Sequence, residues 1–92
     1  MRVLIVEDEK RLAETVRDLM EMNGFTADVC YDGESGLDNA LSGIYDVMIL
    51  DVMLPKKDGF TVLRELRKAG GTVPVLMLTA RSELMDKVTG LD

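Results

Sequence analysis

The chain has 92 residues, of which 47% are hydrophobic and 30% are charged, so it has room for one small domain and not for two. Its formal net charge of −6 argues against general electrostatic binding to nucleic acid or to an anionic membrane. Cys30 is the single cysteine and there is no histidine, which excludes an intrachain disulfide, a Cys/His zinc site and a histidine-assisted nucleophile.

Apolar periodicity predicts a strand and then a helix at the start of the chain. Residues 3–6 form a continuous apolar run that Glu7 and Asp8 end, which is typical of a strand covered on both faces by helices. The apolar side chains that follow recur at helical spacing: Leu12, Val16, Leu19 and Met20. Asn23 and Gly24 then provide a stop signal, so we expect one amphipathic helix between them and the strand.

The same alternation continues through the middle of the chain. Residues 25–30 alternate apolar and polar as in a half-exposed strand, and an Asp-Gly turn then leads into a weaker helix over residues 34–41. Residues 47–50 are the most apolar run in the chain, and this run ends abruptly in Asp51. We therefore expect a carboxylate at the point where a central buried strand emerges.

The last third of the chain predicts a further helix and strand. A loop that contains Pro55 and Gly59 comes first. The helix after it is indicated by apolar side chains at helical spacing: Phe60, Leu63 and Leu66. A Gly-Gly pair then separates this helix from residues 75–78, which we expect to form a fourth buried strand, and another helix is expected from Ser82 onward.

Strands that alternate with helices predict an open α/β fold with a parallel sheet, since parallel neighbours need a long crossover connection and helices supply it. Sites in such sheets form in the crevice beyond the carboxyl ends of the strands. The side chains expected at those ends are Glu7, Asp8, Asp51 and Thr79. A single Asp there is more often a helix cap or a turn residue, but four oxygen-bearing side chains at one edge favour a functional site.

The carboxylates at this edge predict a bound hard cation. Several carboxylates in one crevice repel one another, and a cation with oxygen ligands relieves the repulsion. Mg²⁺ keeps several waters and accepts one or two carboxylates plus phosphate oxygens, a role that Asp8 and Asp51 fit. A carboxylate also serves as a nucleophile through an aspartyl phosphate, so the predicted edge offers the positioning and charge neutralisation that phosphoryl transfer needs.

Three segments of the sequence resemble the motifs of one known family. Bacterial two-component response-regulator receiver domains are similar at Val-Glu-Asp-Glu (residues 6–9), Asp-Val-Met-Leu-Pro-Lys-Lys-Asp-Gly (residues 51–59) and Leu-Thr-Ala-Arg (residues 78–81). The resemblance covers all 92 residues and is greatest to the OmpR/PhoB-like winged-helix transcription regulators. It implies a flavodoxin-like receiver fold, with residues 1–92 as a single receiver domain.

At the matching positions, the resemblance makes Asp51 the phosphoacceptor and Thr79 the switch hydroxyl. It places Mg²⁺, or Mn²⁺ in its stead, against Asp8, Asp51 and the main-chain carbonyl of Met53. Glu7 completes the set, either as a direct ligand or through a metal-bound water. The resemblance further implies a sensor histidine kinase as phosphoryl donor and a change in partner or dimer contacts as output.

The family pattern continues beyond residue 92 with a fifth strand, a fifth helix, a lysine that pairs with the phosphoryl group and a switch aromatic. We therefore expect a C-terminally truncated receiver of four strands and about four helices. Lys56 and Lys57 follow Pro55 in a loop, so we expect them to be solvated rather than to replace that lysine. A bared edge on the fourth strand favours a homodimer formed by edge pairing or by segment swapping.

The expected surroundings of the chain follow from its charge and hydropathy. DNA contact is expected only through an effector domain outside this sequence, because the net charge is negative. No apolar stretch approaches the ~20 residues of a membrane helix, and residues 1–2 lead directly into a short apolar run instead of a signal peptide. We expect a cytoplasmic protein without membrane contact.

Two other functions stay open at the level of sequence. One is a binding or dimerisation scaffold that works without phosphorylation, because the family's lysine is not among the 92 residues. The other is an aspartate-nucleophile phosphatase of the haloacid-dehalogenase type. Those enzymes need a second Asp two residues after the first, where this chain has Met53, which cannot transfer a proton.

Overall fold

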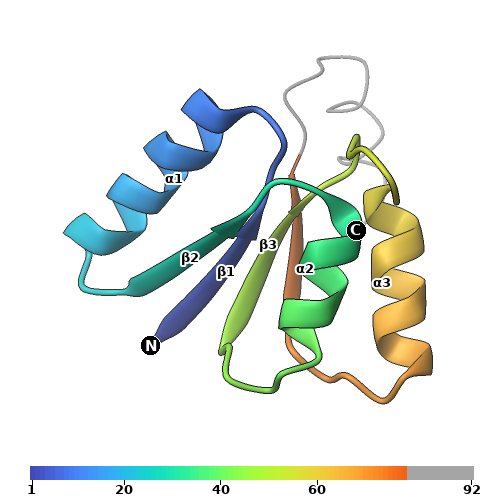
Figure 1. Cartoon of the computed structure of the whole chain (residues 1–92). Coiled ribbons are helices and arrows are strands. Elements are labelled where there is room, and N and C mark those ends of the chain that lie inside the picture. Colours follow the sequence, from blue (N-terminus) through green and yellow to red (C-terminus); the bar gives the residue numbers. More distant parts are fainter. Residues whose placement is uncertain (79–92) are drawn as a thin grey trace, which may run out of the picture.

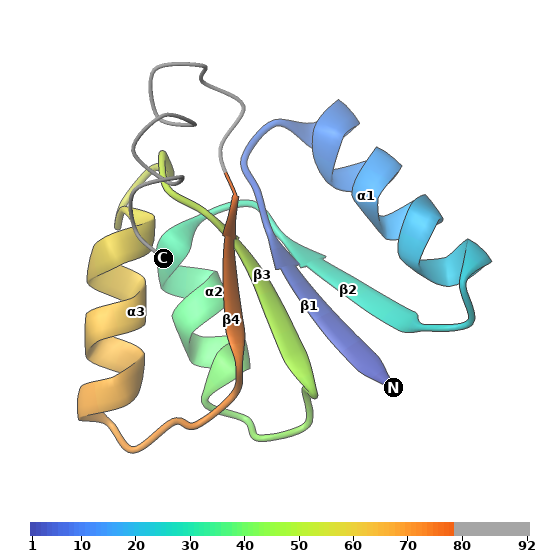
Figure 2. The same cartoon turned by 180° about the vertical axis from the view of Figure 1, so that it is seen from behind.

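The computed structural model describes residues 1–78 and shows one parallel sheet with helices on both of its faces (Figures 1 and 2). The strands are β1 (Arg2–Val6), β2 (Thr26–Cys30), β3 (Val47–Asp51) and β4 (Val75–Leu78). Their spatial order is β2-β1-β3-β4, and each neighbouring pair is parallel. The predicted open α/β class is confirmed, and the order is that of the first four strands of a flavodoxin-like sheet.

The strands of this sheet are connected by α1 (Lys10–Met22), α2 (Gly33–Ala40) and α3 (Gly59–Lys68). Asp32 and Asp58 are the N-caps of α2 and α3, because each carboxylate accepts a hydrogen bond from the backbone N–H three residues later. Helix α1 packs on one face of the sheet, and α2 and α3 lie side by side on the other (Figures 1 and 2). The helix predicted from Ser82 lies outside the described residues. None of the helices in residues 1–78 has the length and apolar character needed to cross a membrane.

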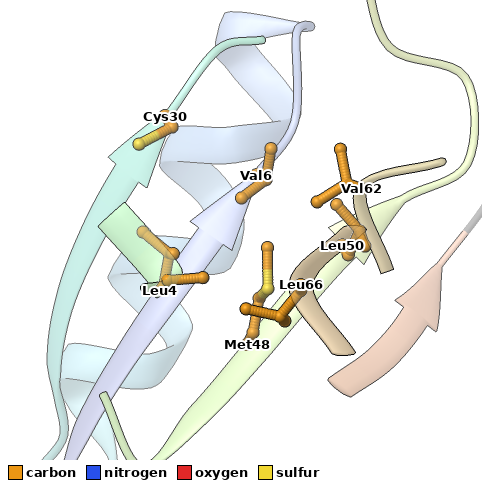
Figure 3. Close-up of a cluster of buried hydrophobic side chains, with 8 residues drawn as sticks. Leu4, Val6, Cys30, Met48, Leu50, Val62 and Leu66 are labelled. Carbon is orange, nitrogen blue, oxygen red and sulfur yellow. The ribbon is translucent and has the colours of Figure 1, made fainter. Parts of the chain in front are cut away.

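The larger hydrophobic core lies between the sheet and the pair of helices α2 and α3 (Figure 3). Its buried side chains are Leu4, Val6, Cys30, Ala40, Met48, Leu50, Val62 and Leu66. Strands β1 and β3 supply half of them, as their continuous apolar runs predict. Full burial of a large aliphatic side chain contributes about 1.5–3 kcal/mol, so this cluster holds β1 and β3 together and fixes where their carboxyl ends lie.

On the opposite face, α1 covers β1 and β2 more fully than the β4 side of the sheet. Val16 and Met20 of α1 pack on a smaller cluster of buried residues from the strands: Val3, Ile5, Ala27 and Ile49. By strand alternation, Leu76 and Leu78 of β4 point to this face, and they are 55% and 43% exposed. The prediction that residues 75–78 form a buried strand is therefore wrong for this face, because no helix within residues 1–78 covers β4 there.

Leu19 is also more exposed than its helical spacing predicts, with 50% of its surface accessible. Successive residues of an α-helix are about 100° apart around the axis, so Ala13, Val16 and Met20 share one stripe and Leu19 falls at its margin. Ala13 is fully buried at the centre of the contact. Helix α1 thus packs on the sheet through a narrower apolar stripe than its sequence predicts, and Ala13 is part of that stripe.

Candidate functional site

The strand order reverses between β1 and β3, and the candidate site lies at that reversal. The chain continues from β1 to β2 on one side and from β3 to β4 on the other, which leaves a crevice beyond the carboxyl ends of the two central strands. Val6 pairs with Leu50 in the sheet register, and the next residues along the two strands are Glu7 and Asp51. The fold therefore brings together two carboxylates that are far apart in the sequence.

Three carboxylates meet in this crevice. One oxygen from each of Glu7, Asp8 and Asp51 lies within 4.8 Å of the other two. Glu7 and Asp51 are each only 9% exposed, whereas Asp8 is open to solvent. The backbone N–H of Glu9 donates a 2.8 Å hydrogen bond to Oε2 of Glu7, which orients that carboxylate. The predicted convergence of these three side chains is therefore present in the structure.

Burial and like charge raise the pKa of both inner carboxyls. For Glu7, burial is the largest cause, and the negative charges of Asp51 and Asp8 add to it, so that the pKa is raised to about 7. For Asp51, burial again does most to raise the pKa, and the charge of Asp8 acts in the same direction. Backbone N–H groups oppose both shifts without cancelling them. Burial and mutual repulsion in the crevice therefore disfavour the ionised forms of these two carboxyls.

The chemistry of the donors fits a hard divalent cation. The three converging groups are all carboxylates, which suit Mg²⁺ or Mn²⁺ better than the softer metals that nitrogen and sulfur ligands select. The exposed side of Asp8 leaves room for the waters that Mg²⁺ retains. Met53 lies two residues beyond Asp51 in the loop that leaves β3, with its side chain half exposed. Thr79 lies outside the described residues.

Neither lysine of the loop after β3 is among the groups that meet at the carboxylates. Nζ of Lys57 forms an ion pair of 2.7 Å with Oε1 of Glu65 on α3. The prediction that Lys57 is simply solvated is therefore wrong, because α3 offers it a carboxylate partner. Lys56 is exposed, as predicted. Its charge helps to lower the pKa of the Asp32 carboxyl, although hydrogen bonding by the backbone of Ser35 is the main cause.

Two glycines shape the loop over residues 52–58, and the sequence predicts only part of what they do. A Cβ atom on Gly59 would overlap the carbonyl oxygen of Asp51, and the Gly59 N–H donates to the carbonyl of Val52 at 2.9 Å. A Cβ atom on Gly33 would overlap the carbonyl oxygen of Lys57. Both glycines follow an Asp, a pattern that predicts turns and helix caps but gives no sign that α2 approaches the loop so closely.

Comparison with known proteins places the chain among signalling proteins. The model of the response regulator receiver domain family matches residues 3–92. Transcriptional regulatory protein DltR of Streptococcus agalactiae is 48% identical over all 92 residues, which are 41% of its own length. Response regulator ArlR of Staphylococcus saprophyticus is 43% identical over 91 residues, and response regulator MprA of Mycobacterium avium is 40% identical over 92. The chain spans about two fifths of the length of these curated relatives.

Solved structures lead to the same family. The receiver domain of the Francisella response regulator 1452 has a TM-score of 0.85 at 34% identity, over 98% of this chain and 74% of that one. Response regulator TrrA of Thermotoga maritima, solved in complex with Mg²⁺ and BeF, has a TM-score of 0.83 at 31% identity, over 97% of this chain and 77% of that one. The fold, the carboxylates at the strand reversal and the family model agree, and the chain belongs to the response regulator receiver domain family.

Proposed function

We propose that this chain is the phosphoacceptor module of a two-component response regulator, with Asp51 as the residue that receives the phosphoryl group. The observation that carries the proposal is the cluster of Glu7, Asp8 and Asp51 at the strand reversal. The receiver TrrA was solved with Mg²⁺ and BeF, which supports a magnesium requirement here by analogy. Residues 1–92 would then act as one receiver domain, not as an enzyme that turns over an external substrate.

In this proposal, Asp51 is the nucleophile. A carboxylate oxygen of Asp51 attacks the phosphorus of a phosphohistidine on a sensor kinase, the P–N bond breaks, and the imidazole leaves with a proton from solvent. The position of Asp51 at the carboxyl end of the central strand β3 supports this role, because attack by a nucleophile depends on its positioning. A divalent cation, when bound, neutralises the charge on the carboxylates and on the phosphoryl oxygens. Hydrolysis of the same acyl phosphate by water would reset the domain.

The other residues of the site have supporting roles in this proposal. Asp8 would hold the cation directly from its exposed position beside Asp51. The main-chain carbonyl of Met53 would be a further ligand, by the family resemblance alone. Glu7 binds directly or orients a metal-bound water, since Mg²⁺ seldom takes three carboxylates. Thr79 is proposed as the switch hydroxyl by the family resemblance alone.

The proposed setting of the module follows its relatives. DltR is named as a transcriptional regulatory protein, and MprA and ArlR are named as response regulators. We infer that phosphorylation here changes partner or dimer contacts in the cytoplasm and controls transcription through a separate DNA-binding domain. The negative charge of the chain is consistent with DNA contact lying elsewhere.

The test is Mg²⁺-dependent modification of Asp51. The protein is incubated with acetyl phosphate, with and without Mg²⁺, and the intact mass is measured by mass spectrometry. We expect the mass to rise by one phosphoryl group only with Mg²⁺, and Asp51→Asn to abolish the change because its amide is not a nucleophile. Asp38→Asn is the matched control, since Asp38 is an exposed residue of α2. An unmodified wild-type protein, or a modified Asp51→Asn variant, would contradict the proposal.

A second candidate function is a self-associating scaffold, which the exposed apolar side chains of β4 favour. A cavity of about 220 Å³ on the α1 side runs from the carboxylates to β4 and is lined by Ile5, Val6, Glu7, Leu12, Val16, Ile49, Asp51 and Leu78. Leu76 adds apolar surface beside it. A homodimer through this face would bury that surface, with or without phosphorylation.

A further inference from the structure

The loop over residues 52–58 lies against the first turn of α2. The backbone N–H of Gly33 donates a 3.3 Å hydrogen bond to the carbonyl oxygen of Pro55. The position that a Cβ atom on Gly33 would take overlaps the carbonyl oxygen of Lys57 and lies 2.8 Å from its carbonyl carbon. Figures 1 and 2 show that α2 and α3 both begin at the edge of the sheet from which this loop leaves β3. Gly33 thus contacts the middle of the loop chiefly through the backbone of Pro55 and Lys57.

The loop has a backbone conformation that its own sequence does not favour. Lys56 has a φ of 68°, which side chains other than glycine rarely adopt. The Lys57 N–H donates a 2.7 Å hydrogen bond to the Pro55 carbonyl across Lys56, which closes a strained γ-turn. Such a conformation persists only where surrounding contacts hold it. The Pro55 carbonyl accepts hydrogen bonds from both the Lys57 N–H and the Gly33 N–H. Helix α2 therefore helps to hold the loop in the strained conformation of Lys56.

Two other contacts also hold the loop in place. The Gly59 N–H donates to the Val52 carbonyl at 2.9 Å, which ties the end of the loop to its beginning. The ion pair between Lys57 and Glu65 ties the loop to α3. Gly33 adds the third attachment, on the side of α2.

We propose that Gly33 is a positioning residue of the phosphoacceptor site: its missing side chain lets α2 hold the loop over residues 52–58, whose Met53 carbonyl would serve as a ligand of the proposed cation. The inference rests on the proposed function, since it concerns a ligand of the proposed metal site. Gly33 touches neither substrate nor metal and acts through the backbone of Pro55 and Lys57.

The substitution Gly33→Ala tests this role. Gly33 is the first residue of α2 and its φ is outside the left-handed region, so alanine fits the backbone and favours the helix more than glycine does. What alanine disturbs is the approach of the Lys57 carbonyl, a backbone group that cannot rotate away. The overlap must be relieved by movement of the loop or of the first turn of α2. We expect the loop to move, because α2 also packs against β1 and α3, and a shifted loop carries the Met53 carbonyl with it.

The experiment compares the wild-type protein with Gly33→Ala and Gly71→Ala. The control Gly71→Ala also inserts a Cβ against tightly packed atoms, those of Leu66, but it lies in the loop before β4, at the opposite end of the strands. The rate of acetyl-phosphate modification is measured against Mg²⁺ concentration. For Gly33→Ala we expect the half-saturating Mg²⁺ concentration to rise roughly 10- to 100-fold, as for other residues that position metal ligands, while the rate at saturating Mg²⁺ is retained.

Gly71→Ala should lower the stability of the fold and leave the half-saturating Mg²⁺ concentration unchanged. Amide chemical shifts of the metal-free protein supply a second readout, because those of residues 52–58 should change in Gly33→Ala and not in Gly71→Ala. An unchanged Mg²⁺ dependence in Gly33→Ala, beside a reactive wild-type protein, would overturn the role of Gly33 and leave the proposed function standing. A wild-type protein without Mg²⁺-dependent modification of Asp51 would overturn the proposed function and this inference together.

Discussion

Glu7 occupies an unfavourable position for a carboxyl group, and the shift of its pKa follows from that position. Burial at the end of β1 is the largest cause of the shift, and the neighbouring charges of Asp51 and Asp8 increase it. The pKa is about 7 in the folded protein against a reference of 4.5. The folded chain therefore holds a proton on Glu7 over a pH range in which the unfolded chain has lost it.

This difference predicts how stability depends on pH. Where the folded state binds more protons than the unfolded state, stability falls as pH rises. The contribution of Glu7 should thus fall between about pH 4.5 and pH 7 and be constant outside that window. Urea unfolding of the metal-free protein, followed by circular dichroism, gives the stability at each pH.

Glu7→Gln is the matched variant, because glutamine has nearly the same shape and does not titrate. The stability of Glu7→Gln relative to wild type should increase as pH rises through the window. A difference between the two proteins that is independent of pH would show that Glu7 ionises normally in the fold.

At the scale of the element, Asp58 determines where α3 begins. Its Oδ1 accepts a 2.9 Å hydrogen bond from the Thr61 N–H, and its Oδ2 accepts one of 3.1 Å from the Thr61 hydroxyl. This geometry is that of a helix N-cap. The N–H of Thr61 is also the main cause that lowers the pKa of Asp58.

Removal of this cap should cost about 1 kcal/mol of stability, within a range of roughly 0.5–2 kcal/mol. Asp58→Ala is expected to show the loss in urea unfolding at neutral pH, whereas Asp58→Asn keeps an acceptor oxygen and should retain most of the stability. Asp38→Ala serves as the control, because Asp38 is exposed near the end of α2. Equal stabilities of Asp58→Ala and wild type would contradict the capping role.

Most of the elements were predictable because their signals are local. Residues 3–6 and 47–50 are apolar throughout, and the structure places them in the two central strands. The convergence of Glu7 and Asp51 was predictable for the same reason, since it follows from the ends of these runs and from the rule for parallel sheets.

What the sequence did not predict depends on contacts between elements. Leu76 and Leu78 are as apolar as a buried strand requires, but their exposure depends on which helix covers that face. The same holds for Leu19, whose spacing fits a helix but whose burial depends on the width of the contact with the sheet. The approach of Gly33 to Lys57 joins two segments that no sequence period links.

At the scale of the whole molecule, the exposed side of β4 predicts self-association. Leu76 is 55% exposed beside the cavity on the α1 side, and β4 is the last strand in the order within residues 1–78. We expect light scattering to show a mass that rises with protein concentration. Leu76→Lys should shift the population toward monomer, because a charged side chain resists burial in an apolar interface.

Leu41→Lys is the control for this substitution, since Leu41 is 43% exposed at the end of α2, which packs on the opposite face of the sheet from Leu76. Leu41→Lys should leave the dependence of the measured mass on protein concentration unchanged. A wild-type protein that stays monomeric at every concentration, or equal effects of the two substitutions, would contradict association through β4.

The position of β1 inside the sheet also bears on how the protein is made. β1 is the first strand in the sequence, yet it pairs with both β2 and β3. Ribosomes add about 5–20 residues per second, so the chain from Val6 to Val47 takes roughly 2–8 seconds to synthesise. During that interval, the apolar run of β1 has emerged without its second neighbour. The segment that becomes the centre of the sheet therefore remains without one of its two neighbouring strands for several seconds while the chain is still growing.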